Sequence, residues 1–88
     1  MKVRLEDLRK RLEGMERAYI AMETDSNGKV VARIMDAGRD TGDQILIPQS
    51  LSKEAAVRNT TEGIERYTGL RRFDRGKEDE ENLIAVFL

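Results

Sequence analysis

The chain has 88 residues, of which 38 % are charged and 39 % hydrophobic, and its formal net charge is −1. This length fits one small domain, and the composition excludes both a membrane-embedded protein and a typical disordered one. Because the sequence contains no cysteine and no histidine, disulfides, Cys–His or Ser–His catalytic pairs and thiolate or imidazole metal sites are also excluded.

Residues 2–16 are predicted to form an amphipathic helix. Apolar side chains recur at alternating spacings of four and three, at Met1, Leu5, Leu8, Leu12 and Met15. This spacing gives one continuous apolar face on a helix, and acidic residues placed four positions before basic ones stabilise the remaining surface. The apolar face either covers the protein's own sheet or forms an interface between copies of the chain.

Residues 17–24 and 29–36 are predicted to pair as a β-hairpin. In the second segment apolar residues alternate between two faces, as in a strand. The four residues between the segments, Asp25-Ser26-Asn27-Gly28, are turn sequence, because an Asn-Gly pair tolerates the positive φ of tight hairpin turns.

A polar, glycine-containing loop is expected at residues 37–44, followed by a short apolar strand at residues 45–47 that Pro48 ends. Three carboxylates lie within eight residues at this loop, on Asp36, Asp40 and Asp43. Such oxygen ligands suit a divalent cation, but their spacing does not match a calcium-binding loop. We therefore interpret them as ordinary loop residues and expect no metal site.

A second helix is predicted to begin after Ser50 or Ser52 and to end at about residue 68. Ser50 or Ser52 can cap its N-terminus, and Glu54 lies near that positive end of the helix. Gly69 is expected to end the helix, because glycine adopts the left-handed conformation that closes many helices.

Residues 70–82 are charged and lack periodicity, so no regular structure is predicted there. Residues 83–88 are an unbroken apolar run, which predicts a strand covered on both faces. Such a strand is expected either in the interior of the sheet or paired across a subunit boundary.

The predicted elements follow the order helix, strand, strand, strand, helix, strand in one domain spanning residues 1–88. This order predicts an α+β fold with a four-stranded, mainly antiparallel sheet and helices packed against it. With two tyrosines, two phenylalanines and no tryptophan, the core is thin, and small domains with thin cores often gain stability from association. A homodimer or larger homo-oligomer is therefore expected.

The predicted oligomer interface combines the apolar helix face with the C-terminal strand. Both segments carry more apolar surface than a thin monomer core needs. The interface residues are Leu5, Leu8, Leu12, Met15, Ile84, Val86 and Phe87.

Residues 66–77 offer an alternative function, because basic residues are interleaved there with aromatic ones. Arginine contacts phosphate groups, and an aromatic ring stacks on an unpaired base. The residues concerned are Arg66, Tyr67, Arg71, Arg72, Phe73 and Arg75. The acidic run at residues 78–81 cancels this charge, which favours salt links within the chain over nucleic-acid binding.

These observations predict a small non-enzymatic interaction protein, a regulator, inhibitor or adaptor, that binds another macromolecule, in the first place a protein. The sequence contains no catalytic constellation and no cofactor motif, so neither enzyme activity nor a cofactor is expected. Nucleic-acid binding through residues 66–77 and a small carboxylate- or metal-dependent enzyme are the alternatives. Without a signal peptide or a membrane-spanning apolar run, a cytoplasmic protein that does not bind membranes is expected.

Overall fold

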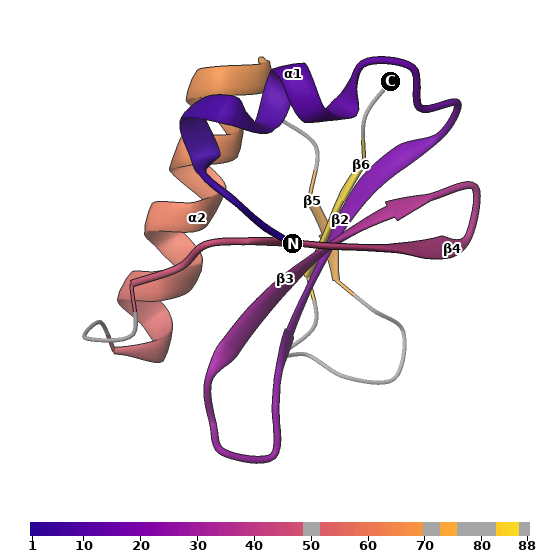
Figure 1. Cartoon of the computed structure of the whole chain (residues 1–88). Coiled ribbons are helices and arrows are strands. Elements are labelled where there is room, and N and C mark those ends of the chain that lie inside the picture. The colour runs from indigo at the N-terminus through magenta and orange to yellow at the C-terminus, as the bar shows by residue number, and fades with distance from the viewer. Residues whose placement is uncertain (49–51, 70–72, 76–82, 87–88) are drawn as a thin grey trace.

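The chain forms an α+β fold in which helices pack on one face of a mixed, mainly antiparallel sheet (Figure 1). The computed structural model describes residues 1–48, 52–69, 73–75 and 83–86. Within these residues the sheet has six strands in the order β1-β4-β3-β2-β6-β5. The predicted class is confirmed, whereas a parallel strand pair and a strand within residues 70–82 were not predicted.

The predicted hairpin is confirmed as β2 (Ala18–Thr24) and β3 (Val30–Asp36), paired along their whole length. Its turn begins at Asp25, whose carboxylate accepts hydrogen bonds from the backbone amides of Asn27 and Lys29, each at 2.9 Å. Gly28 has φ 79°, a conformation that a residue with a Cβ adopts only with strain. Asn27 keeps a negative φ, so only the glycine supplies the left-handed position.

The predicted loop at residues 37–44 is wrong, because most of it is strand β4 (Arg39–Ile45). The connection from β3 is only Ala37-Gly38, with φ 51° and 81°, as in the two-residue turns of hairpins. The register with β3 shifts between Arg33 and Met35. Gly42 lies in this irregular part of β4 with φ 84°, which explains a strand whose sequence lacks regular alternation. The predicted strand at residues 45–47 therefore overlaps β4 only at its first residue.

The predicted helix at residues 2–16 is also wrong in its extent. Its first residues form strand β1 (Lys2–Val3), which pairs in parallel with β4, and only η1 (Leu5–Asp7, a 3-10 helix) and α1 (Leu8–Leu12) are helical. The helix ends because Glu13 is extended and Gly14 has φ 85°. Val3 is buried in the core. Its burial stabilises the chain more than one further helical turn in solvent would.

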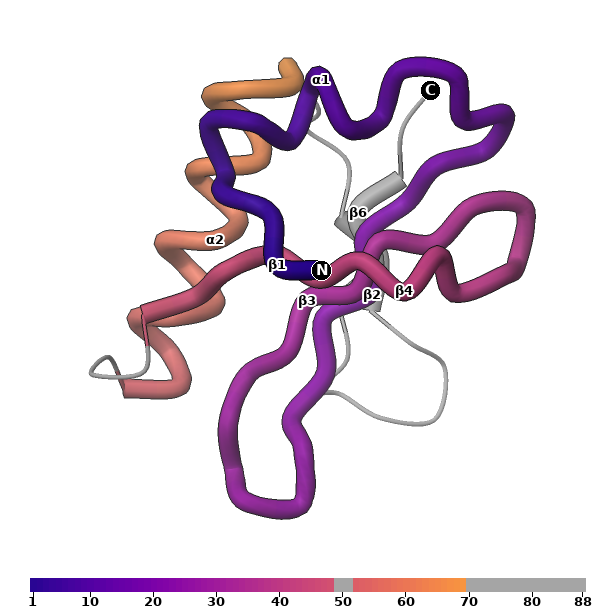
Figure 2. Tube along the Cα trace, in the orientation of Figure 1, coloured from indigo at the N-terminus to yellow at the C-terminus, as the bar shows by residue number. Residues whose placement is uncertain are grey.

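The second helix is confirmed as α2 (Lys53–Thr68), with both predicted ends. The Ser52 hydroxyl accepts a hydrogen bond from the Ala55 amide at 3.2 Å, which caps the N-terminus. At the other end Gly69 is left-handed, with φ 76°, and its amide donates to the Glu65 carbonyl at 2.9 Å. Figure 2 shows α1 lying across the C-terminal end of α2, on the same side of the sheet.

Strand β6 (Leu83–Val86) lies between β2 and β5 (Phe73–Arg75), antiparallel to both. The predicted strand at residues 83–88 is thus an interior strand over its described part. Residues 87 and 88 lie outside the described residues. Strand β5 falls in the segment for which no regular structure was predicted, and it pairs with β6 through three residues.

The core lies between the helices and one face of the sheet. Its described members are Val3, Leu8, Ile20, Met22, Val30, Ala32, Ile34, Ile45, Ile47, Ala56 and Ile64. They come from β1 to β4, from both α-helices and from Ile47, two residues after β4, so the core fixes the helix layer on the sheet. In the described part of the chain, no helix has the length and apolar character needed to cross a membrane.

Candidate binding surfaces

The sheet face opposite the helices is the first candidate surface. Core residues of β2 and β3 alternate with residues that point to this second face. These half-buried residues are Tyr19, Ala21, Glu23, Val31, Arg33 and Met35. The register pairs Tyr19 with Met35 and Ala21 with Arg33. No helix among the described residues packs on this face, which we call the open face (Figure 1).

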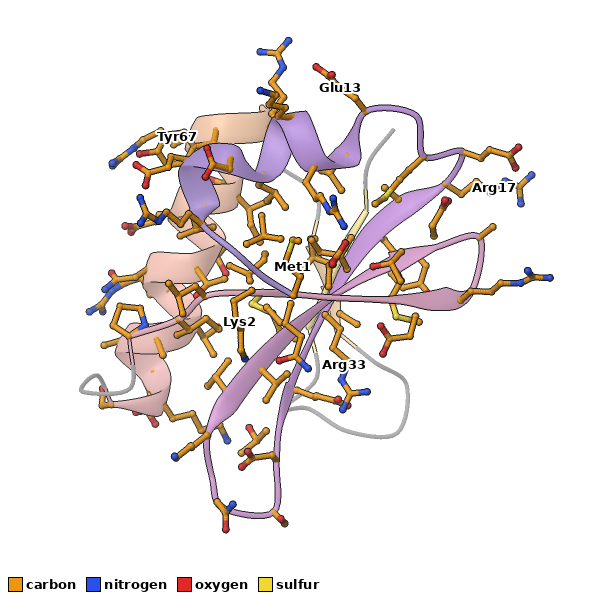
Figure 3. All side chains as sticks on the ribbon, in the orientation of Figure 1. Met1, Lys2, Glu13, Arg17, Arg33 and Tyr67 are labelled. Carbon is orange, nitrogen blue, oxygen red and sulfur yellow. The ribbon has the colours of Figure 1, made fainter. Side chains whose placement is uncertain are left out.

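Arg33 forms two ion pairs at the open face; its side chain is labelled in Figure 3. Its guanidinium Nε lies 2.7 Å from Glu23 Oε1, and Nη1 lies 3.3 Å from Asp40 Oδ2. The three side chains are each about two-fifths exposed, so water screens these ion pairs. The open face therefore presents apolar side chains beside a cation held between two anions.

The backbone register of strand β6 places some of its residues on the open face. The register pairs Tyr19 with Val86 and Ala21 with Ile84, and directly paired positions belong to the same face of a sheet. Two residues of the predicted oligomer interface thus occupy positions on the open face. Phe87 lies outside the described residues.

The remaining predicted interface residues come from the N-terminal apolar stripe. Leu8 is fully buried in the chain's own core, and Leu5, Leu12 and Met15 are half-buried against it. The stripe therefore packs mainly on this chain's own sheet and α2, which was one of the two alternatives. An interface between copies at these residues stays a prediction.

The second candidate surface is a cleft of about 550 Å³ between β1 and α1, which we call the basic cleft. It is lined by Met1, Lys2, Val3, Arg4, Asp7, Lys10 and Arg11. Four basic side chains stand there against one carboxylate. Lys2 belongs to β1, Arg4 directly precedes η1, and the other two belong to α1.

Asp43 orients Arg11, one of the residues that line the basic cleft. Its carboxylate is buried, with the residue 5 % exposed, and Oδ2 accepts a hydrogen bond from Arg11 Nε at 2.7 Å. This hydrogen bond lowers the pKa of Asp43 below its ordinary value, against the effect of desolvation, and raises that of Arg11. The amino group of Met1 lies 3.9 Å from Asp43 Oδ1.

The carboxylates of Asp36, Asp40 and Asp43 each contact different groups. Asp36 Oδ1 accepts from the Arg17 amide at 3.0 Å, and Asp40 contacts Arg33 and the Gly42 amide. Asp43 pairs with Arg11. Among the described ranges, no three acidic residues are grouped so as to hold a metal ion.

The predicted nucleic-acid segment is only partly described. Arg66 and Tyr67 lie at the exposed end of α2 and line a cleft of about 350 Å³ together with Glu6 and Glu62. Arg71 and Arg72 lie outside the described residues. Phe73 and Arg75 belong to β5, of which only the backbone is described. Nucleic-acid binding at this segment stays a prediction.

The sequence analysis missed the basic cleft, although a signal for it exists. Residues 1–11 contain five basic residues, at positions 2, 4, 9, 10 and 11, against two acidic ones. On a continuous helix these charges spread around its surface. The break between β1 and α1 gathers four of them, all but Arg9, around one hollow.

Comparisons with protein-family models, with curated proteins and with solved structures give no match to this chain.

Proposed function

We propose that this protein is a non-enzymatic interaction protein whose open face packs against the open face of a second copy. The observation that carries this proposal is the row of apolar residues on β2 and β3, Tyr19, Val31 and Met35, opposite the helix layer. A sheet with apolar residues on both faces is stable when both faces are covered. The described helices cover only one.

A second copy is the occupant that the charges of the open face favour. In a symmetric dimer the same patch meets itself across a two-fold axis, so it must be complementary to itself. Arg33 lies between Glu23 and Asp40, and the patch therefore carries both signs of charge side by side. The guanidinium of one copy can approach the carboxylates of the other, while Tyr19 and Met35 supply apolar contact.

Such a dimer leaves both helix layers facing outward. A regulator, inhibitor or adaptor of this kind then contacts its further protein partner with those outer surfaces. The sheet-to-sheet contact provides the stability that the thin core of one chain lacks.

The two tyrosines of the chain provide a matched experiment. Tyr19 lies on the open face, whereas Tyr67, which is 38 % exposed, lies on α2 (Figure 3). We expect the wild-type protein to have twice the chain mass of 10.1 kDa in light scattering at micromolar concentration. Tyr19→Lys should reduce the mass to one chain, because the new ammonium group would be buried in the interface.

The control Tyr67→Lys should remain dimeric. A wild-type mass of one chain at every concentration contradicts the proposal. A dimer that survives Tyr19→Lys but dissociates with Tyr67→Lys places the interface on the helix layer instead. Circular dichroism of both variants shows that the fold is retained.

A further inference from the structure

The basic cleft is independent of the open face and carries a separate inference. Its four basic side chains, Lys2, Arg4, Lys10 and Arg11, surround a hollow of about 550 Å³ that contains one lining carboxylate, Asp7. The whole chain has a net charge of −1. The positive potential is therefore local to this cleft and does not come from the overall charge of the protein.

Two of the four cations are held in place by neighbouring residues. Arg11 is hydrogen-bonded to the buried carboxylate of Asp43, and Lys2 Nζ donates to Gln44 Oε1 at 2.7 Å. Both partners belong to β4, so the sheet orients these two side chains at the cleft. Side chains that are already ordered lose less conformational freedom when they bind a ligand.

The other two cations are available to a ligand. The side chain of Lys10 forms no hydrogen bond or ion pair with any residue that the structure describes. Arg4 Nη1 lies 3.8 Å from Glu6 Oε1, and the side chains are 71 % and 58 % exposed. An exposed pair at this distance contributes little to stability, because water screens it. A ligand anion can therefore replace Glu6 at little cost.

We propose that the basic cleft binds the phosphodiester backbone of nucleic acid. Lysine and arginine are the side chains that contact phosphate oxygens most often, and such interfaces are polar and positively charged. A protein partner would instead need an apolar or aromatic anchor at the centre of its site. The lining offers only Met1 as an exposed apolar residue, and it contains no aromatic ring on which a base could stack. Binding is therefore directed at the backbone and tolerates any base sequence.

A fluorescence-anisotropy titration tests this proposal with three labelled 20-nucleotide probes: oligo-dT, oligo-U and a DNA duplex. Each is measured at a series of salt concentrations. The cleft variant Arg4→Gln/Lys10→Gln removes two exposed cations. The control Arg17→Gln/Arg58→Gln removes two exposed cations that lie outside both the basic cleft and residues 66–77, and so changes the net charge equally. Circular dichroism and thermal melting verify that both variants keep the fold.

We expect the wild-type protein to bind at low salt and to lose affinity as salt rises, because phosphate contacts release counterions. The cleft variant should bind at least about tenfold more weakly, and its salt slope on single strands should fall by about 0.7 for each contact removed. The control should bind like the wild type. The ratio among the three probes identifies single-stranded DNA, RNA or duplex as the preferred source of the phosphates.

Three results would overturn the proposal. The first is no binding of any probe at low salt. The second is an equal loss in both variants, which assigns binding to general charge, or a loss only in the control, which assigns binding to another surface. The third is a poly-glutamate peptide that binds the cleft as tightly as the oligonucleotides, which assigns the cleft to an acidic protein segment. None of these results depends on whether the open face forms a dimer.

Discussion

At the scale of single residues, Asp43 joins the sheet to the N-terminal helix. Its backbone belongs to β4, and its carboxylate receives Arg11 from α1 at 2.7 Å. A buried carboxylate without such a donor would be costly, since burial disfavours the charged form. The pair therefore orients α1 and at the same time fixes one cation of the basic cleft.

The Asp43 carboxylate should make stability depend on acidic pH. Its pKa in the folded protein is lowered from the ordinary value of 3.8, chiefly by the Arg11 hydrogen bond. The stabilisation is then fully present above the unfolded-state pKa and is lost as pH falls through the lower folded-state pKa. Urea unfolding from pH 7 to pH 2 should show Asp43→Asn less stable than the wild type at pH 7, with the difference shrinking below about pH 4. A difference that stays constant over this range contradicts the assignment.

Ala37 is the one described non-glycine residue with positive φ, at 51°. A left-handed conformation costs an ordinary residue about 1–2 kcal/mol, and asparagine is preferred at this position of a two-residue hairpin turn. Ala37→Asn should therefore raise the free energy of unfolding by about 0.5–1 kcal/mol in urea denaturation. Ala37→Val, which puts a β-branched side chain at the same φ, should lower it. If both variants match the wild type, the turn has another conformation.

At the scale of elements, the contact between η1 and α2 depends on a glycine. A Cβ atom built on Gly63 would lie 2.5 Å from Leu5 Cδ1 and 3.2 Å from its Cγ. Gly63 is buried in the middle of α2, where glycine costs about 1 kcal/mol of helix stability relative to alanine. The close approach of Leu5 explains why this helix contains it.

A pair of substitutions tests the η1–α2 contact. Gly63→Leu should lower the free energy of unfolding by about 1–3 kcal/mol, because the added side chain fills the space of Leu5. Leu5→Ala removes that obstruction, so the double variant should be more stable than the sum of the two single changes predicts. Urea denaturation of the four proteins measures this coupling. Strict additivity would mean that the two residues do not meet.

At the scale of the whole molecule, the hairpin and α2 could be predicted because their signals are local. The turn sequence ending at Gly28, the cap at Ser52 and the left-handed Gly69 each act within a few residues. Strands β1 and β4 could not be predicted in this way, because β1 is stabilised by pairing with β4, and β4 by pairing with β1 and β3. The apolar period of the following residues extends back to Met1, which favours a helix at Lys2 and Val3. These two residues nevertheless join a strand more than forty positions away, at Gln44 and Ile45.

The candidate surfaces follow the same division. The sequence shows that Tyr19 and Met35 alternate with core residues. Once the covered side of the sheet is known, this alternation assigns both residues to the open face. The basic cleft depends on where α1 begins and on the contact between Arg11 and Asp43, which are 32 positions apart. Periodicity carries no information about such a distant pair.

The strand order of the sheet also has a consequence for how the chain folds. Strands β2, β3 and β4 form a meander joined by short turns, so their pairing closes only small loops. Strands β1 and β6 come from residues 2–3 and 83–86 and flank that meander on its two sides. Closing a loop costs more entropy as it lengthens, and distant contacts slow folding. We therefore expect the meander to form first and the docking of β1 and β6 on its edges to limit the rate of folding.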